Sequence, residues 1–144
     1  MNLMDFFIPK SATYYLSDTS TIRQALEKFD AHKFTVVPLL TAEGDYISTV
    51  SVGDILSYIK NEARFDLSAA ESVRVRDIPK YHPYRACRLS ESNDEILQLA
   101  LEQNFIPLVD DRNKYMGFVK RKAILATMIG RVREMEAEKR EAEK

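Results

Sequence analysis

Two short segments combine residue types that could bind a ligand, and each follows an apolar run at the point where a helical pattern begins. The first is Ser51-Val52-Gly53-Asp54. Its carboxylate could accept hydrogen bonds from a diol, such as the two hydroxyls of a ribose. The same residues also form a self-sufficient helix start, with Ser51 at the N-cap and Asp54 at N3. The two interpretations are compatible, and both stay open.

The second segment is Lys120-Arg121-Lys122-Ala123. Three cations in the first turn of a helix oppose the helix dipole, each by about 0.3 to 1 kcal/mol before screening. One interpretation is a solvated basic face, which exposed lysines tolerate. The other is a phosphate that binds main-chain N–H groups together with Arg121 or Lys120. The sequence therefore offers a diol acceptor at one junction and an anion site at the other.

The two junctions occupy equivalent places in an internal repeat. Matching segments recur at an offset of 69 or 70 residues. They pair Ile8-Pro9-Lys10 with Ile78-Pro79-Lys80, Pro38-Leu39 with Pro107-Leu108, Tyr46 with Tyr115, and Ile55-Leu56 with Ile124-Leu125. Such a repeat indicates that one structural unit occurs twice.

Each copy predicts the order strand, helix, strand, strand, helix, so the expected fold class is α/β (α+β). The pattern of each copy is a short first strand, a helix with i, i+3, i+4 spacing, then two apolar runs joined by a polar turn. The short strands are expected near Thr13 to Leu16 and near Ala86 to Leu89. The expected boundaries are 6–60 for the first unit, 61–76 for an ordered connector, 77–130 for the second unit and 131–144 for a charged helical tail.

The composition excludes several classes of protein. The 144 residues are 45% hydrophobic, and 21 Lys and Arg nearly balance 22 Asp and Glu, so no overall charge indicates a nucleic-acid or membrane partner. The residues before Lys10 lack the pattern of a leader or a membrane span, and a cytoplasmic protein is expected.

Nothing in the sequence predicts an enzyme or a metal site. Motifs that bring a nucleophile and a base together, or that build a metal cage, are missing. His32 and His82 are expected at the surface, and the lone Cys87 is expected to be a small buried hydrophobe.

The end of the chain leaves two interpretations open. Apolar residues follow a helical stripe from Ile124 through Met128 to Met135, and residues 136–144 are almost wholly charged. The helix could end in a solvated, fraying segment, or the stripe from Met128 to Met135 could form a dimer contact.

With these features together, the sequence resembles a tandem pair of CBS domains, also called a Bateman module, of the stand-alone bacterial type. The resemblance covers about residues 6–130. It rests on Phe34-Thr35-Val36-Val37-Pro38, Tyr46 to Ser51 and Asp54-Ile55-Leu56 in the first unit, and on Phe105 to Asp111 and Tyr115 to Val119 in the second.

The resemblance implies a regulatory sensor whose two units pack about a pseudo-twofold axis and bind an adenosine ligand between them. Carried over by position, Ser51 and Asp54 would hold the ribose, and Arg121 with Lys120 would reach a phosphate. The adenine pocket would be lined by Ala12, Thr13, Tyr14, Thr35, Val36 and Pro38. Such modules are usually dimers, and a homodimer through the second helices is expected, with an unknown downstream partner.

The second unit departs from the pattern, because Lys120 and Ala123 replace the hydroxyl and the carboxylate. The expectation is therefore one asymmetric site, with Asp54 from one copy and Arg121 from the other, that needs no further cofactor. Some members of the CBS family place basic residues just before the proline, where they contact phosphates. This sequence lacks them, so AMP or ADP is expected ahead of ATP. Cyclic di-AMP and S-adenosylmethionine remain alternative ligands, and an interaction module without a small ligand remains the alternative function.

Overall fold

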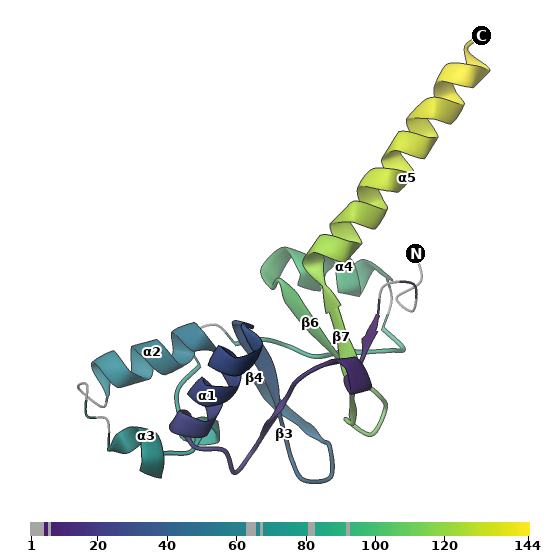
Figure 1. The fold of residues 1–144 in the computed structure, drawn as a ribbon. Helices are drawn as coiled ribbons and strands as arrows, with labels where there is room; N and C mark the ends of the chain where they lie inside the picture. Colours follow the sequence, from purple (N-terminus) through teal and green to yellow (C-terminus); the bar gives the residue numbers. More distant parts are fainter. Residues whose placement is uncertain (1–4, 6, 63–65, 67, 81–82, 92) are drawn as a thin grey trace.

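The computed structural model describes residues 5, 7–62, 66, 68–80, 83–91 and 93–144. The helices and strands include the predicted order of each unit, with the strand β1 (Ile8–Pro9) and the short helix α3 (Ala69–Ser72) in addition (Figure 1). The first part of the chain holds β1 (Ile8–Pro9), β2 (Leu16–Ser17), α1 (Ile22–His32), β3 (Val36–Leu40), β4 (Tyr46–Ser51) and α2 (Val52–Asn61). The second part holds β5 (Cys87–Arg88), α4 (Asn93–Glu102), β6 (Phe105–Val109), β7 (Tyr115–Lys120) and α5 (Arg121–Ala142), after the short α3 (Ala69–Ser72).

The two sheets share one plan, which confirms the predicted repeat. In one sheet β2 pairs parallel with β3, and β3 pairs antiparallel with β4. In the other, β5 pairs parallel with β6, and β6 pairs antiparallel with β7. Pro38 is tolerated in the central strand β3 because β2 pairs only with Leu39 and Leu40, so the proline lies where no β2 residue needs its missing N–H.

The first strand of the first unit is shorter than predicted. The sequence placed it near Thr13 to Leu16, but β2 begins at Leu16. Thr13 directs both its main-chain N–H and its hydroxyl to the carbonyl oxygen of Lys10, at 3.0 and 2.9 Å, which closes a 3₁₀ turn. The backbone at Thr13 is therefore held in a turn and is unavailable to the sheet.

The segment that precedes each unit in the sequence packs into the other unit. β1 pairs with β7, so the N-terminal strand belongs to the sheet of the second unit, and Phe7 packs against that unit's core. Conversely, Val75 and Ile78 pack into the core of the first unit. Residues at the start of the chain thus complete the second unit, and residues between the units complete the first.

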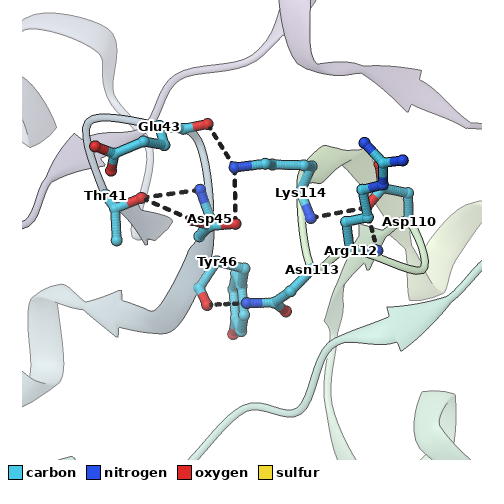
Figure 2. Close-up of polar contacts among 8 residues, drawn as sticks. All are labelled: Thr41, Glu43, Asp45, Tyr46, Asp110, Arg112, Asn113 and Lys114. Atoms are coloured by element: carbon cyan, nitrogen blue, oxygen red, sulfur yellow. Dashed lines mark hydrogen bonds and ion pairs between the residues drawn. The ribbon is translucent and has the colours of Figure 1, made fainter.

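The two units contact each other through their hairpin turns, 41–45 and 110–114 (Figure 2). The N–H of Tyr46 donates to the carbonyl of Asn113, and the N–H of Tyr115 donates to the carbonyl of Gly44, both at 3.0 Å. Tyr46 and Tyr115 are equivalent in the repeat, as are Gly44 and Asn113, which both have positive φ. The pair of bonds is therefore reciprocal, as a pseudo-twofold axis between the units requires.

Side chains extend this turn contact. The ammonium of Lys114 lies 3.0 Å from a carboxylate oxygen of Asp45 and donates to the carbonyl of Glu43 at 3.0 Å (Figure 2). Asn113 donates its side-chain amide to the carbonyl of Tyr46 at 2.8 Å. Together with the reciprocal main-chain bonds, these contacts hold the two hairpins side by side.

Helix α5 continues well past the body of the protein (Figure 1). It runs from Arg121 to Ala142 as one helix, and only Ile124 in it is buried. Val132 and Met135 are 51% and 67% exposed. Neither helix α5 nor any other helix in the described part of the chain is long and apolar enough to cross a membrane.

Candidate functional site

A cleft of about 780 Å³ lies between the two units. This volume is within the range of small-molecule and cofactor sites. The cleft is lined by Ala12 to Tyr14, Lys33 to Pro38, Asn104, Phe105, Phe118, Lys120 to Lys122, Leu125, Ala126 and Ile129. Both units and the segment that crosses between them therefore contribute to one site.

One wall of the cleft is largely apolar and aromatic. The ring of Tyr14 stacks on the ring of His32 at 3.8 Å between centroids and on Phe34 at 5.4 Å. Val36 and Pro38 continue this wall along β3. The surface is suited to the flat face of an aromatic ligand.

His32 is exposed, as the sequence predicted, and it ends helix α1. Lys33, in the left-handed conformation with φ of 56°, then turns the chain towards β3. This turn brings Lys33 and Phe34 to the cleft. His82 lies outside the described residues.

The opposite wall carries the positive charge. Helix α5 begins here with Arg121 and Lys122, has no side-chain cap at Lys120 and has no acidic residue in its first turn. The guanidinium Nε of Arg121 donates to the carbonyl of Ala100 at 2.6 Å, which fixes the side chain against the end of α4. An uncapped helix start with three cations favours an anion.

The equivalent start of α2 is satisfied by its own side chains. Ser51 Oγ accepts from the N–H of Asp54 at 3.0 Å, and Asp54 accepts from the N–H of Ser51 at 3.1 Å. Asp54 is 1% exposed. The local capping interpretation of this segment is therefore confirmed.

The structure brings eight of the ten predicted site residues together at the cleft. They are Ala12, Thr13, Tyr14, Thr35, Val36, Pro38, Lys120 and Arg121. Ser51 and Asp54 do not line it. The two junctions are related by the internal symmetry, since Val52 donates its N–H to the carbonyl of Thr35 and Arg121 donates its N–H to the carbonyl of Asn104.

The charge of Asp54 acts instead on Tyr84 and Lys80. Burial raises the pKa of Tyr84, the Asp54 carboxylate raises it further, and Arg121 lowers it. Burial lowers the pKa of Lys80, and the charges of Asp54 and Asp77 oppose that shift. Tyr84 also donates its hydroxyl to the side chain of Asn104 at 3.1 Å. These groups form the surroundings of the Ser51–Asp54 junction.

Sequence reasoning missed the part of the cleft formed by α5. Lys122, Leu125, Ala126 and Ile129 all line it. Their spacing of three or four residues after the basic junction is the signal that could have found them, because such positions share one face of a helix.

Among the described residues, no three His, Cys, Asp or Glu side chains could hold a metal ion. Cys87 is fully buried, as predicted, and burial is the largest of the causes that raise the pKa of its thiol to about 12. A thiol with such a pKa stays protonated at neutral pH and is a poor nucleophile.

The comparisons with known proteins agree with this architecture. Residues 7–61 match the family model of the CBS domain. Among solved structures, CbpB in complex with c-di-AMP superposes with a TM-score of 0.79 at 21% identity, covering 96% of this chain and 91% of that one. The chain has the fold of a tandem CBS-domain pair.

Two further structures extend the comparison. CbpB of Listeria monocytogenes in complex with c-di-AMP has a TM-score of 0.80 at 20% identity and covers 91% of this chain and 97% of that one. CBSX2 in complex with AMP has a TM-score of 0.71 at 23% identity, with 90% and 96% covered. No curated protein is detectably similar in sequence.

Proposed function

We propose that this CBS pair is a regulatory module that reversibly binds an adenosine phosphate in the cleft between its units. One observation carries the proposal: an apolar, aromatic wall faces an uncapped, cationic helix start across an open cleft of about 780 Å³. A nucleotide has the same two parts, a flat base and an anionic phosphate. Similar folds in complex with c-di-AMP and with AMP support the choice of ligand class.

In this proposal the base contacts Tyr14, Val36 and Pro38, and the phosphate lies at Lys120 and Arg121. The main-chain N–H of Arg121 donates to the carbonyl of Asn104, and its Nε donates to the carbonyl of Ala100, so both its backbone and its side chain are fixed at the edge of the site. Lys120 is exposed and has no cap role, so it can turn towards the ligand. AMP and ADP fit the expected charge, and cyclic di-AMP, S-adenosylmethionine and ATP are the alternatives to compare.

Isothermal titration calorimetry with these five ligands tests the proposal. Lys120→Ala should weaken the affinity for the ligand that binds by about fivefold, which corresponds to about 1 kcal/mol for one charged contact. Lys139→Ala is the matched control, because Lys139 lies near the far end of the same helix and is exposed. If none of the five ligands binds, the proposed function is wrong.

The ribose role of Ser51 and Asp54 is a separate part of the proposal. Since they do not line the cleft, a ligand that uses them would occupy the equivalent junction beside Tyr84. Asp54→Asn keeps an acceptor for the Ser51 N–H and removes the charge, so the helix cap is largely preserved. If calorimetry of Asp54→Asn shows the loss of one of two binding steps, the protein has two separate sites. If all binding is lost, Asp54 and the cleft form one composite site. If binding is unchanged, Asp54 does not contact the ligand.

An interaction module is the second candidate function, favoured by the exposed stripe on α5. Leu125, Ile129, Val132 and Met135 are each at least half exposed. A homodimer through this stripe would bury them. Sedimentation analysis of Val132→Asp should then show a monomer, while Leu101→Asp, at an exposed position on α4, should leave the dimer intact. A wild-type chain that is monomeric at high concentration would exclude the dimer.

A further inference from the structure

The cleft wall at Ala12 to Tyr14 belongs to a segment that crosses between the two sheets. This crossing segment, Ile8–Ser17, begins as β1 against β7 and ends as β2 against β3. Between the two strands it forms the 3₁₀ turn Lys10–Ala12 and then the residues that line the cleft. Its position therefore depends on both units at once.

Two equivalent tyrosines use their hydroxyls differently. Tyr46, in the first unit, shares a hydrogen bond of 2.7 Å with Thr49 on its own strand. The residue equivalent to Thr49 in the second unit is Phe118, which has no hydroxyl. Tyr115 instead donates its hydroxyl across to Thr13, at 3.3 Å, within the crossing segment. Because Phe118 stands where the first unit has Thr49, Tyr115 has no hydroxyl partner on its own strand and bonds to Thr13 in the cleft wall instead.

Tyr115 also belongs to the contact between the hairpin turns. Its main-chain N–H donates to the carbonyl of Gly44 in the first unit. The ring is 3% exposed, so its hydroxyl is held in one place by packing. From Tyr115 the hydrogen bonds continue through the Thr13 hydroxyl to the carbonyl of Lys10. One residue therefore connects the turn contact, the 3₁₀ turn and the cleft wall.

We propose that Tyr115 is a positioning residue of the cleft, which holds Thr13 in place and couples occupancy of the cleft to the contact between the hairpin turns. The coupling to a nucleotide rests on the proposed function, but the positioning of Thr13 does not. Tyr115 does not line the cleft. The hydroxyl of Tyr115 therefore acts on a ligand indirectly, through its bond to Thr13 in the crossing segment.

Tyr115→Phe tests this role, with Tyr46→Phe as the matched control. Each change removes one largely buried hydroxyl and its bond and keeps the ring, so both should reduce stability to a similar extent. Only Tyr115→Phe should loosen the crossing segment. Amide hydrogen exchange, read from a peptide that covers Lys10 to Leu16, should be about three- to tenfold faster in Tyr115→Phe and unchanged in Tyr46→Phe. The N–H of Thr13, bonded to Lys10, lies within that peptide.

The second measurement is calorimetry with AMP and with c-di-AMP as probes. Tyr115→Phe should weaken the binding of whichever probe the wild type binds by about threefold or more, and Tyr46→Phe should not. Equal exchange in both variants and the wild type would overturn the positioning role. Faster exchange in Tyr115→Phe with unchanged affinity would overturn the coupling. A wild type that binds neither probe while Tyr115→Phe still loosens the segment would refute binding of these ligands and leave the positioning role standing.

Discussion

Gly117 decides whether the N-terminal strand can join the second sheet. Its φ of +146° lies in a region that other residues rarely adopt. A Cβ at this position would lie 2.1 Å from the carbonyl oxygen of Ile8 and 2.6 Å from the ring of Phe7. The first atom is backbone in the strand that pairs with Gly117, so it cannot rotate away. Gly117→Ala must therefore either strain β7 or displace β1.

The cost can be estimated for both responses. If β1 stays, the strained φ costs about 1 to 2 kcal/mol and the overpacking about 1 to 3 kcal/mol. If β1 detaches, the protein loses ladder hydrogen bonds of about 1 kcal/mol each and part of the burial of Phe7, about 1 to 2 kcal/mol. The strain route therefore costs about 2 to 5 kcal/mol, and detachment with the loss of one or two ladder bonds costs about 2 to 4 kcal/mol. This is a large part of the stability of a domain, which is typically about 5 to 15 kcal/mol.

Urea denaturation followed by circular dichroism measures the loss. Gly130→Ala is the matched control, because a Cβ there meets nothing within 4 Å and the residue lies inside helix α5. That control should gain about 0.5 to 1 kcal/mol from helix propensity. Hydrogen exchange in β1 distinguishes strain from detachment. A Gly117→Ala variant within about 0.5 kcal/mol of the wild type would refute the close approach of β1 to β7.

Two further predictions concern caps and alkaline pH. Ser51→Ala should lower the free energy of unfolding by about 1 kcal/mol, because it removes the cap of α2. Lys120→Asp should raise the free energy of unfolding by about 1 kcal/mol, because the new side chain can cap α5, and it should weaken nucleotide binding, because a cation is lost. Urea denaturation and calorimetric titration of Lys120→Asp check this, and a variant that loses stability together with affinity would contradict it. Burial raises the pKa values of Tyr46 and Tyr115 to about 12. Since unfolded tyrosines lose their protons near pH 10, the part of the stability that these two tyrosines contribute should be constant below that pH and should be lost as pH rises towards 12. Denaturation curves between about pH 10 and pH 12 that do not shift would exclude the effect.

The repeated plan of the fold could be read from the sequence because it is local. Spacing of apolar residues, polar turns and the paired prolines are properties of short windows, and they recur at one offset. Eight of the residues that line the cleft were predicted, most of them by position from the resemblance to a CBS pair. Sequence also identified both helix starts and their opposite chemistry, since capping and helix dipoles act within one turn.

The tertiary structure alone decided which sheet the N-terminal strand joins and which junction faces the cleft. Two-residue strands such as β1 have no periodicity to detect, and the pairing of β1 depends on a left-handed glycine 108 residues away in β7. The second decision could not be made from the repeat. Lys120 and Ser51 occupy equivalent places in the two units, but only Lys120 lines the cleft, whereas the equivalent residues Thr35 and Asn104 both line it. The internal repeat shows that two positions are equivalent, but only the packing of the two units determines which of them lines the cleft.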